Sequence, residues 1–484
     1  MHGTTPGQVE AIVAAAARAA APWAARGRGE RALALRAIAD RLDGAAEELV
    51  AIAQRETHLA PRRLRSELVR TTFQLRLFAE VVTEGAYLDV RVDHADPDWP
   101  TGPRPDLRRT QIPLGPVVVF AASNFPFAFS VVGGDTVSAL AAGCPVIVKT
   151  HPGHPDLSEA TGRIAREALE SAGAPESLLQ SVHGREAGAA VLRHPRIKAG
   201  AFTGSIPGGR ALFDIAASRP EPVPFYGELG SVNPVFVTAR ADADRGEDVA
   251  AGLVGSFTLG AGQFCTKPGV VLVPTGSKVL AHLRRAPLPG ASPMLNDRIA
   301  DGFQRGLAAL SAHPEVEVAA RSGDAASGAP GPTVLVTSAD ALLKDPGTLL
   351  AECFGPVVLV AEYTEEAQMA DVASALEGQL TATLVADEHD DVLPRLIAVL
   401  GTRAGRLLWD QWPTGVTVSH AQHHGGPYPA TTAAGTTSVG ATAIARFLRP
   451  LAYQGFPPSL LPEELREDTD VPRRVDGGLI GHAR

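Results

Sequence analysis

Cysteine is scarce in this chain of 484 residues, which contains three of them: Cys144, Cys265 and Cys353. A set that is both small and odd in number does not form a disulfide framework. No pair of cysteines, and no cysteine with a histidine, has the spacing of a zinc site. We therefore expect no disulfide and no bound metal, and the composition favours a reducing, cytoplasmic compartment.

The chain also lacks a basic stripe and a long apolar run. Its net charge is −9 and both signs are scattered, which disfavours nucleic acid as a partner. No uninterrupted apolar window approaches the roughly 18 residues of a membrane span. No secretory signal is visible, and the alanine- and arginine-rich start is compatible with a transit peptide. The same amphipathic pattern continues into a stretch rich in acids, however, which favours a structural pair of helices.

The pattern of apolar residues divides the chain into regions. Apolar residues at three- and four-residue spacing predict helices over residues 8–86. Short alternating pieces broken by proline predict a β excursion over 90–115. From 116 to 227, buried-strand patterns alternate with helices, which predicts a parallel sheet covered on both faces. A second α/β stretch begins at about residue 228.

Cys265 lies among small and turn-forming residues in the segment GAGQFCTKPG. A catalytic thiol needs access and a lowered pKa, and a glycine-rich approach leaves room for a substrate. Taken alone, a cysteine is more often a small core residue, which is what we expect of Cys144 and Cys353.

Two other segments offer acid–base and anion-stabilising groups. In PFYGELGSVNP, Glu228 stands beside two glycines just before a strand, where a carboxylate can act as a general base. In FAASNFPFAF, Asn124 follows a strand, and its amide can donate to an oxyanion. A solvated loop acid and a turn asparagine are the simpler interpretations.

Two further segments suggest a nucleotide site. Lys149 ends the strand PVIVK, and the carboxyl ends of parallel strands are where α/β sheets bind ligands. In AFTGSIPGGRALF, Gly204 and Gly209 flank a strand-to-helix turn, where backbone amides can approach a phosphate. This spacing differs from the common G-x-G-x-x-G fingerprint and is a weak signal alone. A strand-end lysine can equally point into water.

The combination and order of these segments resemble the aldehyde dehydrogenase superfamily over most of the chain. The family order is followed by SNFPF, VIVKTHP, FTGSIPGG, GELGSVNP, GQFC and ECFGP. The segments KTHPGHP, GELGSVNP and HHGGPYPATT are similar to those of the NADP-tolerant subgroup that includes 2,5-dioxopentanoate (α-ketoglutaric semialdehyde) dehydrogenases.

The resemblance implies a role for each matching residue. Cys265 matches the nucleophile, Glu228 the general base, and Asn124 the oxyanion donor that acts with the Cys265 N–H. The cofactor positions match Lys149 for the adenosine ribose, Gly204, Ser205 and Gly209 for the pyrophosphate turn, and Glu352 and Phe354 for the nicotinamide ribose and ring. The implied reaction oxidises an aldehyde to a carboxylate with NAD or NADP, through a thiohemiacetal and a thioester on Cys265.

Departures from the family pattern bear on the cofactor and on proton transfer. Many NAD-preferring relatives have a glutamate where this chain has Pro152, and without it a 2′-phosphate is not repelled. Arg185 follows a strand and can pair with that phosphate, or it is a surface arginine. NADP is therefore the favoured cofactor. His424 lies where relatives have an FGG-like segment, and it either assists proton transfer or packs in a loop.

The family's substrate funnel is lined partly by an early helix, for which LVRTTFQLRLF is the candidate. An arginine there, Arg70 or Arg76, would suit an aldehyde that carries a carboxylate, such as 2,5-dioxopentanoate. If both arginines face outward, as helix charges mostly do, medium- or long-chain aliphatic aldehydes remain as the alternative.

By resemblance the fold is α/β, with a Rossmann-like cofactor domain, an α/β catalytic domain and a small β oligomerisation element. The expected parts are 1–89 with 116–227 for NAD(P), 228–420 for catalysis, 90–115 with 455–484 for oligomerisation, and 421–454 returning near the active site. An edge strand of the small element would join a homodimer or homotetramer.

Three other functions remain as alternatives. A thiol hydrolase or acyltransferase could use Cys265 and His424 without a nucleotide, but the phosphate turn argues against it. A CoA-acylating relative typically lacks the base that Glu228 matches. A structural member without activity would not need the intact set of nucleophile, base and oxyanion donor.

Overall fold

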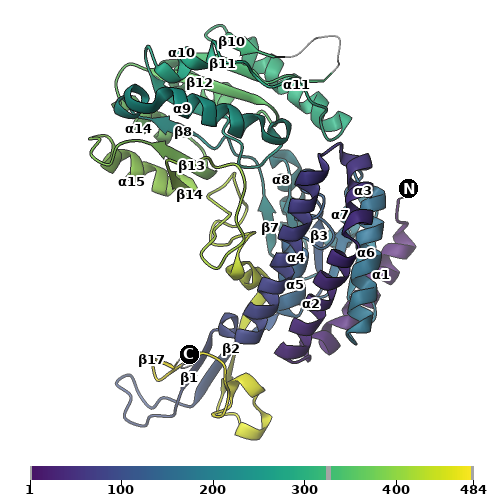
Figure 1. Cartoon of the computed structure of the whole chain (residues 1–484). Coiled ribbons are helices and arrows are strands. Elements are labelled where there is room, and N and C mark those ends of the chain that lie inside the picture. The colour runs from purple at the N-terminus through teal and green to yellow at the C-terminus, as the bar shows by residue number, and fades with distance from the viewer. Residues whose placement is uncertain (1–2, 323–328, 481–484) are drawn as a thin grey trace.

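The computed structural model describes residues 3–322 and 329–480. Within these residues the strands form three sheets, and helices cover the two larger ones (Figure 1). The small third sheet projects from the first α/β unit at the end where the chain terminates (Figure 1). This arrangement confirms the predicted α/β class.

The N-terminal helices pack around the first sheet. α1 (Pro6–Ala24) begins with a capping box, in which Thr5 accepts from the Gln8 N–H and the Gln8 side chain accepts from the Thr5 N–H. α1 lies on one face of the sheet with α7, and their apolar side chains form one core there. On the other face lie α2 (Arg28–Gly44), α3 (Ala46–Thr57) and α4 (Pro61–Glu84).

The first sheet is parallel, with strand order β5-β4-β3-β6-β7. Its strands are β3 (Val117–Phe120), β4 (Val146–Lys149), β5 (Leu179–Val182), β6 (Ala199–Thr203) and β7 (Phe225–Glu228), linked through α5 (Gly134–Ala142), α6 (Pro155–Ser171), α7 (Arg185–Arg193) and α8 (Ile206–Ala217). The order reverses between β3 and β6, and ligands of such sheets bind outside the carboxyl ends of the strands at that point.

The second sheet has the order β10-β11-β12-β9-β8-β13-β14 and is parallel except for β10. Its strands are β8 (Val235–Val237), β9 (Val270–Pro274), β10 (Glu317–Arg321), β11 (Thr333–Ser338), β12 (Val357–Tyr363), β13 (Gln379–Val385) and β14 (Ala404–Trp409). The helices are α9 (Ala239–Thr258), α10 (Lys278–Leu283), α11 (Asp297–Ser311), α12 (Ala339–Lys344), α13 (Pro346–Leu349), α14 (Ala367–Ala375) and α15 (Leu393–Arg403). Separate apolar cores fill its two faces, as the continuous apolar strands require.

The third sheet corrects one predicted boundary. Its order is β15-β2-β1-β16-β17, from β15 (Leu448–Gln454), β2 (Leu107–Pro113), β1 (Val90–Asp93), β16 (Arg473–Val475) and β17 (Gly478–Ile480). β15 pairs antiparallel with β2 along its whole length, so the C-terminal part of this element begins at residue 448 rather than 455. Its side chains are half-buried or exposed, which leaves little apolar pattern to reveal a strand.

Among the described residues, no helix is both long enough and apolar enough to cross a membrane.

Candidate active site

Cys265 lies on a loop that follows α9, and three residues of this loop have left-handed backbone conformations. Gly260, Ala261 and Gly262 all have positive φ. A Cβ on Gly262 would come within 2.3 Å of the backbone of Gly355, so only glycine allows these two loops to approach. The Asn233 side chain donates to the Cys265 carbonyl at 2.8 Å and thereby fixes the loop that presents the thiol.

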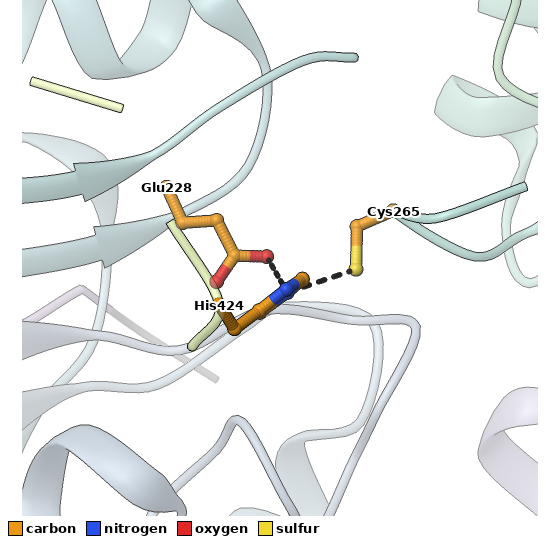
Figure 2. A group of neighbouring side chains, drawn as sticks. All are labelled: Glu228, Cys265 and His424. Carbon is orange, nitrogen blue, oxygen red and sulfur yellow. Dashed lines mark hydrogen bonds and ion pairs between the residues drawn. The ribbon is translucent and has the colours of Figure 1, made fainter. Parts of the chain in front are cut away.

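Three functional side chains meet at this loop (Figure 2). His424 Nε2 lies 2.8 Å from Glu228 Oε1 and 3.5 Å from Cys265 Sγ. Glu228 ends β7 of the first sheet, whereas His424 comes from the loop after β14 of the second. Glu228 and His424 are buried, with exposed fractions of 3% and 1%. A thiol, a carboxylate and an imidazole are thus within reach of one another.

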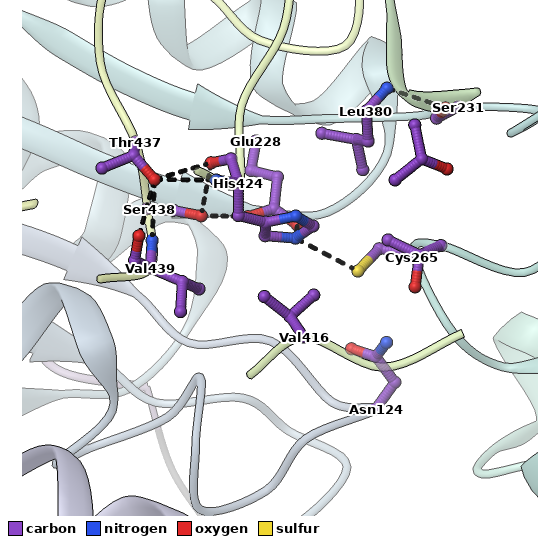
Figure 3. A network of polar contacts seen from close by, with 12 residues as sticks. Asn124, Glu228, Ser231, Cys265, Leu380, Val416, His424, Thr437, Ser438 and Val439 are labelled. Carbon is purple, nitrogen blue, oxygen red and sulfur yellow. Dashed lines mark hydrogen bonds and ion pairs between the residues drawn. The ribbon is translucent and has the colours of Figure 1, made fainter. Parts of the chain in front are cut away.

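A second set of hydrogen bonds holds the carboxylate and the imidazole (Figure 3). The Ser438 hydroxyl donates to Glu228 Oε2 at 2.6 Å. The backbone N–H of His424 donates to Thr437 Oγ1 at 2.8 Å. Burial raises the pKa of Glu228, but the interaction and hydrogen bond with His424 and the hydrogen bonds from Ser438 and Cys265 lower it by more. The net pKa lies below the ordinary value, so this buried carboxylate is ionised at neutral pH.

The thiol of Cys265 does not have the lowered pKa that the sequence led us to expect. Burial raises its pKa well above the ordinary value, and the negative charge of Glu228 raises it further. In the absence of ligands Cys265 is therefore a protonated thiol at neutral pH. His424 and Glu228 are the titratable groups in contact with this thiol.

Asn124 follows β3 and points toward the loop that carries Cys265. Its side-chain amide donates to the Gln263 carbonyl at 3.1 Å. Its own carbonyl accepts from Arg63 of α4 at 2.6 Å, and that guanidinium stacks over the rings of Phe125 and Phe264. Helix α4 therefore fixes the position of Asn124 relative to the thiol.

The carboxyl edge of the first sheet has the features of a dinucleotide site. Ser205 caps α8 and accepts from the Gly208 N–H at 3.4 Å, and this turn is exposed. A Cβ on Gly209 would lie 2.0 Å from the Cδ2 atom of Leu229, which follows β7, so the glycine lets α8 pack closely against that side chain. Lys149 ends β4 at the same edge, and burial together with the charge of Arg298 lowers its pKa. The open helix N-terminus fits a diphosphate.

Glu352 and Phe354 lie in the loop before β12. A Cβ on Gly230 would come within 2.6 Å of the Glu352 carboxylate, which places this side chain beside the loop that follows Glu228. Burial raises the pKa of Glu352 to about 7, although the charge of Lys267 opposes the shift. The buried Lys267 ammonium donates to the carbonyls of Cys353 and Val357, which ties this loop to the Cys265 loop.

The two arginines predicted for the substrate funnel point in different directions. Arg76 follows Arg70 by six residues on α4, which turns it by about 120° around the helix axis. Its guanidinium lies 2.6 Å from Asp40 and 2.8 Å from Asp43 on the surface of α2. The structure therefore removes Arg76 from the candidate site.

Arg70, by contrast, is directed inward. Its Nε donates to the Val416 carbonyl at 3.3 Å, and its guanidinium lies over the Phe129 ring. Among the described residues, its buried Nη1 has no hydrogen-bond partner. Burial lowers the pKa of Arg70, and the negative charge of Glu67 on the same helix, followed by the nearby Cys265 and Glu228, opposes that effect.

The other predicted residues lie either on the surface or in the core. Arg185 is the first residue of α7 and is exposed at the carboxyl end of β5. Cys144 and Cys353 are buried, which confirms them as core residues, and burial raises the pKa of each to about 11.

Glu228, Cys265 and His424 offer ligand atoms within 4.8 Å of one another. Zinc accepts these ligand types, so the expected absence of a metal stays a prediction.

Several functional residues escaped the sequence-based prediction. Asn233 is the most informative: it is fully buried, has a φ of 48°, and donates to the carbonyls of both Cys265 and Lys267. An asparagine before Pro234 in the segment SVNP is a weak turn signal. Ser438 and Lys267 had no local signal, because their partners are remote in sequence or are backbone carbonyls.

Comparison with known proteins gives a consistent picture. Residues 1–285 match the family model described as aldehyde dehydrogenase family. The chain is 47% identical to alpha-ketoglutaric semialdehyde dehydrogenase 2 of Azospirillum brasilense, covering 92% of this chain and 87% of that protein. It is 42% identical to alpha-ketoglutaric semialdehyde dehydrogenase of Acinetobacter baylyi, covering 93% and 87%. The crystal structure of lactaldehyde dehydrogenase from Escherichia coli shares the fold with a TM-score of 0.79 at 20% identity, covering 93% and 92%.

The fold and the site define a class, an α/β oxidoreductase in which a thiol and a carboxylate meet between two domains. The chain belongs to the aldehyde dehydrogenase family. It is an enzyme that oxidises an aldehyde to a carboxylate, and members of this family use NAD or NADP.

Proposed function

We propose that this aldehyde dehydrogenase acts on 2,5-dioxopentanoate and converts it into 2-oxoglutarate. The observation that carries the proposal is the half-buried Arg70, which lies close to Cys265 and has a buried Nη1 without a hydrogen-bond partner among the described residues. A buried N–H donor without a hydrogen-bond partner is costly, and a substrate carboxylate would remove that cost. The two relatives named for α-ketoglutaric semialdehyde support the same substrate.

In the proposed mechanism Cys265 carries the acyl group. His424 takes the thiol proton, and the thiolate sulfur then bonds to the aldehyde carbon to form a thiohemiacetal. The Asn124 amide and the Cys265 N–H stabilise its oxygen, which requires the amide to exchange the Gln263 carbonyl for the substrate. Loss of hydride leaves a thioester. Glu228 then takes a proton from water, whose oxygen replaces the sulfur and releases the carboxylate.

His424 and Ser438 would hold the base in place. Both bind the Glu228 carboxylate, one at each oxygen. The imidazole Nε2 also lies 3.5 Å from the thiol, so we assign His424 the removal of the Cys265 proton, which leaves Glu228 as the base for the hydrolytic water.

The first α/β unit would hold the nucleotide, and the second would present the thiol. Lys149 would bind the adenosine ribose, the turn at Gly204, Ser205 and Gly209 the pyrophosphate, and Glu352 and Phe354 the nicotinamide end. When bound, the nicotinamide supplies the hydride acceptor.

The role of Arg70 is tested by Arg70→Met. The variant is expected to lower kcat/KM for 2,5-dioxopentanoate by about 10- to 100-fold, because a charged hydrogen bond to the carboxylate is lost. Turnover of hexanal, which has no carboxylate, should change little. Initial rates of reduced-nicotinamide formation measure both, and the surface variant Arg76→Met is the matched control. A wild-type enzyme that strongly prefers hexanal would reject the diacid-like substrate and favour the aliphatic alternative.

We further propose that NADP is preferred over NAD. Pro152 provides no carboxylate against a 2′-phosphate, and the exposed Arg185 begins α7 at the nucleotide edge of the sheet. Arg185→Ala is expected to shift the ratio of kcat/KM for NADP over NAD toward NAD by about tenfold. Arg193→Ala, at the other end of the same helix, should leave the ratio unchanged. An unaltered ratio in Arg185→Ala refutes the assignment of this residue.

The small third sheet would join subunits into a homodimer or homotetramer. Its outer strands β15 and β17 each have an edge that no described strand covers, and Leu479 and Ile480 on β17 are exposed.

A further inference from the structure

A second arginine, the half-buried Arg406 on β14, approaches the thiol from the second sheet. Its Nη2 donates to the carbonyls of Pro413 and Gly415 at 3.3 and 3.5 Å. Its Nε is buried and has no hydrogen-bond partner among residues 3–322 and 329–480. Burial lowers the pKa of Arg406, and the proximity of the Cys265 sulfur opposes that effect.

One loop links both arginines to the catalytic thiol. Arg406 binds the carbonyls of Pro413 and Gly415, and Arg70 binds the carbonyl of the adjacent Val416. The Gly415 N–H donates to Thr266, the residue that follows Cys265. The close-up in Figure 3 includes Val416 with Cys265, His424 and Asn124. Residues 413–416 therefore hold the two guanidinium groups near the sulfur.

The two guanidinium groups offer different donors. Arg70 uses its Nε on the protein, so its terminal nitrogens are free to receive the two oxygens of a carboxylate. Arg406 uses its Nη2 on the protein and leaves a buried Nε–H, which suits a single oxygen. In 2,5-dioxopentanoate a carboxylate and a keto oxygen are adjacent, and only two methylene groups separate them from the aldehyde.

Resting on the function proposed above, we infer that Arg406 is a specificity-determining residue that donates its Nε–H to the 2-oxo group of the substrate. Arg70 binds the neighbouring carboxylate. The site thus selects 2-oxo acids that end in an aldehyde over semialdehydes that have the same length but lack the keto oxygen. Such a selection fits the general rule that a site with an unpaired buried donor rejects a ligand that cannot satisfy it.

The test compares two substrates that differ in one group, 2,5-dioxopentanoate and 5-oxopentanoate. The wild-type enzyme is expected to prefer the first in kcat/KM by about 10- to 100-fold. Arg406→Lys keeps the positive charge but lacks the Nε donor, and it should reduce this preference to within about threefold, through loss on the first substrate alone. Arg403, a half-buried arginine that donates to the Ser374 carbonyl, provides the control, and Arg403→Lys should retain the preference.

Binding of the product gives a readout that is independent of catalysis. Calorimetric titration with 2-oxoglutarate and with glutarate should show a preference for 2-oxoglutarate that Arg406→Lys abolishes. The inference is overturned if the wild-type enzyme does not distinguish the two substrates, or if Arg406→Lys slows both equally or neither. If neither carboxylate substrate is better than hexanal, the proposed function itself is wrong, and this result is distinct from the others.

Discussion

Replacing Cys265 by alanine is expected to lower the rate of aldehyde oxidation by at least about 10⁴-fold, because no other group can carry the acyl intermediate. The thiol is the only sulfur among the described residues that meets both His424 and Glu228. Cys144 and Cys353 are buried elsewhere in the core. The rate is measured by the absorbance of the reduced nicotinamide with 2,5-dioxopentanoate as substrate.

The matched control for this substitution is Cys144→Ala, which removes a buried thiol remote from the site. It should keep nearly full activity, apart from a modest loss of stability. Nucleotide affinity of Cys265→Ala should be unchanged within a few-fold, since the proposed nucleotide contacts come from the first sheet. Retention of more than about a tenth of the activity in Cys265→Ala would be incompatible with a thioester on this residue.

The second large effect is expected from Glu228→Gln, which should lower steady-state kcat by about 10²- to 10⁴-fold. Glutamine keeps the size of the side chain but cannot take a proton from water, so hydrolysis of the thioester becomes slow. Formation of the thioester precedes that step. A rapid first turnover should therefore still produce a burst of reduced nicotinamide, close to one equivalent per active site, in stopped-flow absorbance.

In the same variant, which turns over more slowly, the reactivity of the Cys265 thiol is expected to increase. The negative charge of Glu228 contributes to the raised pKa of Cys265, after burial. Removing this charge lowers the pKa, so the thiolate fraction at pH 8 rises and alkylation by iodoacetamide should become faster. Glu221→Gln, which breaks a surface ion pair with Lys198, is the control. Slower alkylation in Glu228→Gln, or the absence of a burst, would contradict the assigned roles.

Much of the framework could be predicted from the sequence because the relevant signals are local. Alternating strand and helix patterns indicated both parallel sheets, and glycine-rich turns marked Cys265, Glu228 and the phosphate loop. β15 was missed, since an edge strand in a small sheet buries few of its side chains. Arg76 was predicted beside Arg70 because the two are close in sequence. Six positions along a helix, however, turn a side chain by about 120° around the helix axis, so the two arginines point in different directions.

The contacts that complete the site could not be predicted in the same way. Ser438 and Glu228 are 210 positions apart, and Arg406 meets Arg70 only through the loop at 413–416. These contacts depend on how the two α/β units pack against each other. The local pattern of residues along the sequence does not reveal that packing. The raised pKa of Cys265 is likewise a consequence of burial beside Glu228 rather than of its sequence surroundings.

The central claim is that Cys265 becomes covalently acylated by the aldehyde. Intact-protein mass spectrometry of Glu228→Gln, quenched in acid after mixing with NADP and 2,5-dioxopentanoate, tests it most directly, because hydrolysis is blocked in this variant. The account predicts one added acyl group for each equivalent of reduced nicotinamide, located on the peptide that contains Cys265 and absent from the double variant with Cys265→Ala. Reduced nicotinamide formed without any adduct on Cys265 would contradict it.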